Sequence, residues 1–107
     1  MLRLKIGTVL LASLTLASAA LAADTVNVSQ QNRKFAPDAI TVTRGTTVHI
    51  VNDDKVTHHI YIDSSAMKFD SGEQPVGKSV DVLFDRDGSF TVRCAIHPTM
   101  RLAVTVQ

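Results

Sequence analysis

The sequence predicts an all-β protein, a β-sandwich, on the basis of three observations. From residue 23 onward, apolar residues recur at every second position in short runs, the period of a half-buried strand. Clusters of Gly, Pro, Asp, Asn and Ser separate these runs and are typical of turns. This part of the chain contains no convincing amphipathic helix pattern. Six to eight short strands, arranged as an antiparallel or mixed sandwich, are therefore expected.

The first strands follow directly from this alternation. Val26 and Val28 alternate with polar residues in the first expected strand, and residues 40–43 form the second. A turn at 44–46 leads into a third strand over 47–51. This half of the domain therefore contributes three strands joined by polar turns.

A polar connection over 52–55 precedes the next expected strand, 58–62, in which His58, Ile60 and Ile62 share one face. One irregular helical turn is expected within 64–69. The remaining strands are separated by turn signals at 70–72, 75–77 and 85–88, and they cover residues 80–84, 89–94 and 103–106.

The N-terminus has the order of regions that is typical of a secretory signal peptide. Arg3 and Lys5 provide a basic start, residues 6–16 are apolar, and residues 20–22 (Ala-Leu-Ala) resemble a cleavage site. The apolar run is shorter than the roughly 20 residues that span a bilayer, so an uncleaved membrane anchor is the weaker alternative. We expect a signal peptide over 1–22, a single domain over 23–107, a periplasmic location and no stable membrane span after cleavage.

The charge of the mature domain excludes one class of partner. Removing Arg3 and Lys5 with the leader leaves nine basic and ten acidic residues, and no basic stripe with interleaved aromatics is present. Nucleic-acid binding is therefore not expected.

The chain has a single cysteine, Cys94, so it cannot form an internal disulfide. A free thiol in an exported protein is explained either by burial as an inert core residue or by metal coordination.

Coordination is favoured by the neighbours of Cys94. His97 and Met100 follow it at intervals of three residues, at the end of an apolar alternating segment. Thiolate, thioether and imidazole together select copper over harder metal ions, and two His, one Cys and a weak axial Met are the set of a blue-copper site. His58 and His59 are candidates for the second histidine. Adjacent strand residues point to opposite faces, and His58 is in phase with the apolar positions that follow it.

The chain resembles the small cupredoxins of the plastocyanin and amicyanin kind over most of residues 26–106. The spacing of three from Cys to His and from His to Met is that of amicyanin. The residues that carry the resemblance are Phe35-Ala36-Pro37, Gly45-Thr46-Thr47-Val48, Asn52-Asp53, His58, Gly88-Ser89-Phe90, and Cys94, His97 and Met100.

This resemblance implies a Greek-key β-sandwich that binds one copper ion, cycling between Cu(I) and Cu(II). His58, Cys94 and His97 would be its equatorial ligands and Met100 its axial ligand. The implied activity is single-electron transfer between transient redox partners, by a monomer that is not an enzyme. Copper storage, delivery or tolerance is the alternative function. The exposed edge of the His97 ring, with Ile96 beside it, would be the surface through which electrons pass.

One departure from the family pattern concerns His59. The family usually has Asn after the first ligand histidine, whereas this chain has a second His. His59 is expected either to form hydrogen bonds beside the site in place of that Asn or to face solvent. A further hypothesis assigns His59 and Met67 to a secondary copper site. His49 is expected to face solvent, and residues 53–55 to form a solvated turn.

Overall fold

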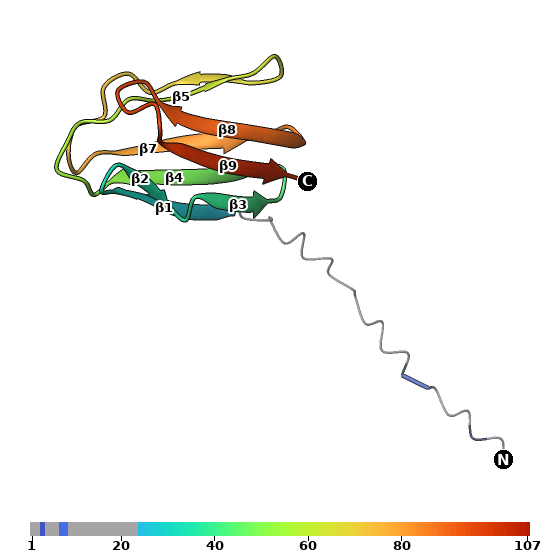
Figure 1. Ribbon diagram of the computed structural model, residues 1–107. Helices are drawn as coiled ribbons and strands as arrows, with labels where there is room; N and C mark the ends of the chain where they lie inside the picture. Colours follow the sequence, from blue (N-terminus) through green and yellow to red (C-terminus); the bar gives the residue numbers. More distant parts are fainter. Residues whose placement is uncertain (1–2, 4–6, 9–23) are drawn as a thin grey trace.

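The computed structural model describes residues 3, 7, 8 and 24–107, and residues 24–107 contain two β-sheets packed on one another (Figure 1). The residues described include no helix, so the predicted all-β class is confirmed for this part of the chain. Accordingly, none of these residues belongs to a helix long and apolar enough to cross a membrane. The expected signal peptide falls almost entirely outside the described residues.

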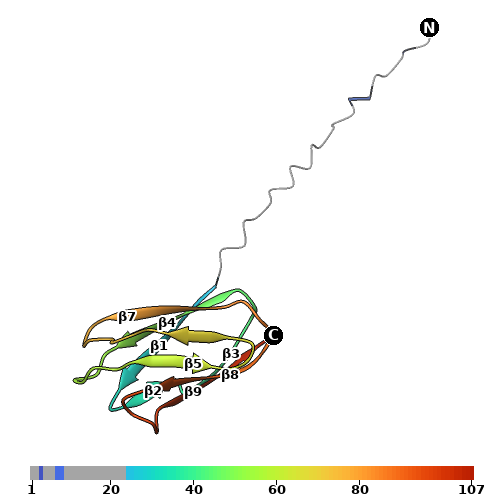
Figure 2. The same ribbon diagram turned by 90° about the horizontal axis from the view of Figure 1, so that it is seen from above.

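Nine strands make up the two sheets. They are β1 (Thr25–Gln31), β2 (Lys34–Ala36), β3 (Ala39–Val42), β4 (Thr46–Asn52), β5 (Ile60–Asp63), β6 (Lys68–Asp70), β7 (Ser79–Phe84), β8 (Gly88–Cys94) and β9 (Arg101–Val106). One sheet has the order β2-β1-β4-β7 and the other β3-β9-β8-β5-β6 (Figure 2). The pairs β1–β4 and β3–β9 are parallel and the others antiparallel, so the sandwich is mixed.

The hairpin of β5 and β6 differs from the expectation for this region. An irregular helical turn was expected within 64–69, but Lys68–Asp70 is strand β6 and pairs antiparallel with β5. The Ser64 hydroxyl accepts a hydrogen bond from the Met67 N–H (2.9 Å) and closes a tight turn. Strand β5 begins at Ile60, and His58 before it makes a single antiparallel bridge with Gln74.

The core lies between the sheets, where the inward residues of each strand alternate with outward ones. Phe35, Phe84 and Phe90 are buried, and the partly buried Phe69 packs against the core. The remaining buried apolar side chains are Val28, Val42, Val48, Ile50, Ile60, Ile62, Val82, Val92, Cys94, Met100, Leu102, Val104 and Val106. Burial of this apolar surface is the main force that holds the two sheets together.

The interior is polar at the end of the sandwich where β4 and β8 finish. Gln30, Asn52 and Gln74 are buried there. The Asn52 side-chain amide donates to the carbonyls of Val56 (2.9 Å) and Gln74 (3.0 Å). The Gln74 amide donates to the carbonyls of Ile50 (3.1 Å) and Lys78. These bonds fix the loops that follow β4 and precede β7, and the first of these loops carries His58.

Candidate metal centre

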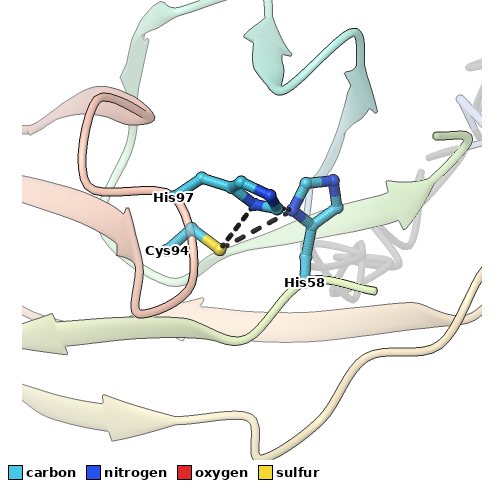
Figure 3. Close-up of side chains that lie close together, drawn as sticks. All are labelled: His58, Cys94 and His97. Carbon is cyan, nitrogen blue, oxygen red and sulfur yellow. Dashed lines mark hydrogen bonds between the residues drawn. The ribbon is translucent and has the colours of Figure 1, made fainter. Parts of the chain in front are cut away.

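Three side chains direct their donor atoms to one point at this end of the molecule (Figure 3). Cys94 Sγ lies 3.6 Å from His58 Nδ1 and 3.7 Å from His97 Nδ1, and the two ring nitrogens are 3.2 Å apart. Donors that share one ion are separated by such distances, since metal bonds to imidazole nitrogen and thiolate sulfur are about 2.0 to 2.3 Å long. Two imidazoles and one thiolate are also a chemically suitable set for a soft or borderline ion.

Each of the three side chains is held by a different part of the fold. Cys94 is the last residue of β8 and is buried, in phase with Phe90 and Val92. His97 follows in the loop between β8 and β9. A hydrogen bond from the Met100 N–H to the His97 carbonyl (3.0 Å) closes this loop. His58 is fixed by its backbone, whose N–H and carbonyl both bond to Gln74, at 3.0 and 2.7 Å.

A carboxylate behind His58 fixes the tautomer of its ring. Asp54 Oδ2 lies 3.1 Å from His58 Nε2 and also accepts the Arg33 N–H (2.8 Å). The pKa of Asp54 is lowered to about 2. The largest cause is this backbone hydrogen bond from Arg33, and smaller contributions come from the Lys55 N–H and the His58 ring. The ionised carboxylate can only accept, so Nε2 carries the proton and Nδ1 offers its lone pair to the site. The sequence had suggested a solvated turn here; the Asp54 side chain is in fact only 10% exposed.

The His97 ring is also prepared to act as a ligand. Burial, together with the neighbouring His58 and Arg33, lowers the pKa of His97 below its ordinary value of 6.5, although Asp54 opposes this. At neutral pH the ring is therefore neutral, the form that binds metal ions. Unlike His58, His97 remains partly exposed, in agreement with the expectation of an accessible ring edge.

The structure brings three of the four predicted site residues, His58, Cys94 and His97, together. Met100 is 1% exposed and lies between the His97 loop and β9. Its axial role stays a prediction. Among the two adjacent histidines, His58 joins the cluster, whereas the His59 ring pairs with the Asp70 carboxylate on the surface.

His59 nevertheless contributes to the site through its backbone. Its carbonyl accepts the Ala95 N–H (2.8 Å) and so ties the segment of His58 to the segment of Cys94. The hypothesis of a second copper site with Met67 is wrong on geometric grounds. Met67 lies at the tip of the β5–β6 hairpin, beyond the Asp63–Lys68 pair, whereas His59 precedes the opposite end of β5.

Two supporting residues were not identified from the sequence. Asp54 stands four residues before His58, and Gln74 stands at the start of a turn with no motif around it. A signal did exist for Asp54, since Asn52 is well suited to an Asx turn that orients the next residues, and its side-chain oxygen accepts the Asp54 N–H (3.0 Å). Gln74 gave no comparable signal.

Comparisons with known proteins agree with this geometry. The sequence model of the cupredoxin-like domain family matches residues 5–106. Among curated protein sequences, no significant match was found.

Solved structures with the same fold include a purple cupredoxin from Nitrosopumilus maritimus, with 24% identity and a TM-score of 0.69 over 77% of this chain and 99% of that one. Amicyanin from Paracoccus versutus is 26% identical, with a TM-score of 0.71 over 83% and 87%. A copper-containing nitrite reductase from Thermus scotoductus is 23% identical, with a TM-score of 0.70 over 78% of this chain but only 22% of the enzyme chain.

Proposed function

Because the chain belongs to the cupredoxin-like family, we propose that it binds one copper ion through His58, Cys94, His97 and Met100 and carries single electrons between redox partners. The observation that carries this proposal is the convergence of one sulfur and two ring nitrogens within 3.7 Å. A bound copper ion would supply the one-electron chemistry by passing between Cu(I) and Cu(II).

The residues of the chain provide what a rapid electron carrier requires. Backbone bonds and the Asp54 carboxylate fix the His58 ring before any ion arrives, so little rearrangement should accompany a change of oxidation state. His58, Cys94 and Met100 are buried, which keeps water away from the metal.

Electron exchange would take place at the His97 surface. His97 is partly exposed, and its neighbour Ile96 is 49% exposed. A small apolar surface around one exposed ligand suits short-lived encounters, which bury less than about 1,200 Å². We further propose that the domain acts as an exported monomer in the periplasm, on the basis of the leader-like sequence of residues 1–22.

The proposal is tested by the optical spectrum of the copper-loaded, oxidised protein. We expect an intense thiolate-to-copper charge-transfer band that Cys94→Ser abolishes, with His49→Gln as a control that removes a histidine outside the site. Stopped-flow kinetics then separate the two functions. A carrier exchanges electrons quickly and retains copper in both oxidation states. Rapid release of Cu(I) to an acceptor protein with slow electron exchange would instead establish copper delivery.

A further inference from the structure

A pocket with a strongly basic rim lies beside the candidate metal centre. It has a volume of about 260 Å³ and lies between the β1–β2 turn and the start of β9. Its cationic side chains are Arg33, Lys34 and Arg101, its acidic one is Asp38, and two buried residues, Phe35 and Met100, also line it. We call it the cationic pocket. Because Met100 is an expected copper ligand, whatever occupies this pocket lies close to the metal.

The three cations of the cationic pocket are available to an external partner. All three are exposed, and within residues 24–107 none of them forms an ion pair. Asp54, which accepts the Arg33 N–H, turns its carboxylate inward to the His58 ring. The rim therefore carries an excess of positive charge, although the mature domain as a whole is nearly neutral.

Three acidic side chains on other surfaces of the domain are engaged locally. Asp63 pairs with Lys68 (2.8 Å), Asp70 with His59, and Asp81 with His49. Asp85 and Asp87 lie in the turn between β7 and β8, at the end of the sandwich away from the metal centre. The metal end also carries the exposed cations Lys55 and Lys78, but the cationic pocket is where three cations line one hollow.

The backbone of Arg33 gives an independent reason to assign its side chain a role. Asn32 and Arg33 have φ values of 52° and 56°, in a two-residue hairpin turn. Gly is the preferred second residue of such a turn, and a bulky residue there carries strain. Strained residues persist where surrounding contacts enforce them, often at functional sites. Here the Arg33 N–H is held by Asp54, which in turn holds the ligand His58.

We propose that the cationic pocket docks an acidic surface of a redox partner protein, with a partner carboxylate placed between Arg33 and Arg101. The inference rests on the proposed electron-transfer function and adds the chemistry of the partner. Guanidinium groups bind carboxylates with directed, paired hydrogen bonds. Charge complementarity of this kind mainly speeds the encounter and fixes the orientation of the partners. The docked partner would then lie against the metal end, beside Met100 and close to the exposed His97 edge.

A binding experiment tests the pocket without relying on electron transfer. The amide NMR spectrum of the Cu(I) or metal-free protein is recorded with hexacyanochromate(III), an inert paramagnetic anion. We expect broadening centred on residues 33, 34 and 101, reversed by a Glu-rich peptide and by salt. It should be lost in the double variant Arg33→Gln/Arg101→Gln and retained in Arg86→Gln, the matched control at the far end. Broadening that the double variant leaves unchanged, or that the peptide does not reverse, would overturn docking of an acidic protein.

A kinetic experiment tests the link to electron transfer. Oxidation of the Cu(I) protein by hexacyanoferrate(III) should slow by about three- to tenfold in the double variant, and the difference should shrink as ionic strength rises. A cationic cobalt(III) oxidant should show the opposite trend, and Arg86→Gln should match the wild type with both. Equal rates for the wild type and the double variant would contradict the inference. A protein that binds the peptide but forms no charge-transfer band would contradict the proposed function instead.

Discussion

The two halves of the interior are built from different chemistry. Away from the metal centre the space between the sheets is filled with apolar side chains, among them the rings of Phe84 and Phe90, whose centroids lie 6.0 Å apart. At the metal end the buried positions include Gln30, Asn52, Gln74 and His58. The apolar half contributes stability through burial, whereas the polar half fixes loops and orients ligands through directed hydrogen bonds. The difference indicates that stability and site geometry reside in separate regions.

The largest effect is expected from a cavity in the apolar half. Phe84→Ala should lower the free energy of unfolding of the metal-free protein by about 3 to 5 kcal/mol, because it removes a fully buried ring. Chemical denaturation measures this loss. Copper affinity, measured by competition with a Cu(I) chelator under folding conditions, should not change. A large fall in the affinity of the folded variant would show that the two halves are coupled.

In the polar half, the expected effect is on metal affinity. Asp54→Asn should weaken copper binding by about 10- to 100-fold, because the amide no longer fixes the protonation of the His58 ring. The same chelator competition measures it. Asp81→Asn is the matched control, since it alters an exposed His–Asp pair on the outer face of β4 and β7. If both variants lose affinity equally, the carboxylate acts through overall charge and not through orientation.

Removal of a buried amide should have a smaller effect, of opposite sign. Gln30 is 0% exposed, and neither atom of its amide has a hydrogen-bond partner among the described residues. Gln30→Leu should therefore raise the free energy of unfolding by about 1 to 2 kcal/mol, the cost of burying an unpaired polar group. Denaturant titration measures the change. A loss of stability would mean that the amide is hydrogen-bonded in solution, for example by an internal water molecule.

The smallest effect concerns pH. Burial lowers the pKa of His97 in the folded, metal-free protein, so the unfolded chain binds more protons as the pH falls below about 6.5. The contribution of His97 to stability is complete above that pH and is lost as the pH falls toward the lower folded value. Thermal melts of the metal-free protein between pH 5 and pH 8 should show this decline. His97→Gln should flatten it; an unchanged slope in this variant would assign the decline to other groups.

Sequence alone predicted the features that depend on local periodicity and spacing. The alternation of Val80, Val82 and Phe84 identified a strand, and the three-residue interval from Cys94 to His97 pointed to two members of the donor cluster. Strand alternation also favoured His58 over His59, and the structure places His58, not His59, in the donor cluster.

Features that depend on distant contacts were not predicted. Strands β2 and β6 contain three residues each, too few to show a period, and the residues of β6 fall partly in the expected helical turn (64–69) and partly in the turn signal at 70–72. The role of Asp54 depends on the β1–β2 turn, which brings the Arg33 N–H to it from 21 residues earlier. The Gln30 amide is buried without a partner because of how the two sheets pack together, and this packing cannot be inferred from a short segment of sequence.

The parallel pairing of β3 with β9 bears on when the ion can be captured. Strand β3 borders only β9 in its sheet, and β9 directly follows the loop that carries His97 and Met100. Pairing between segments so far apart in sequence forms slowly, because a long stretch of chain must first be ordered. We therefore expect the completion of this sheet to be a late folding step. Since β9 holds the end of the loop that carries His97, we expect copper to enter a largely folded protein.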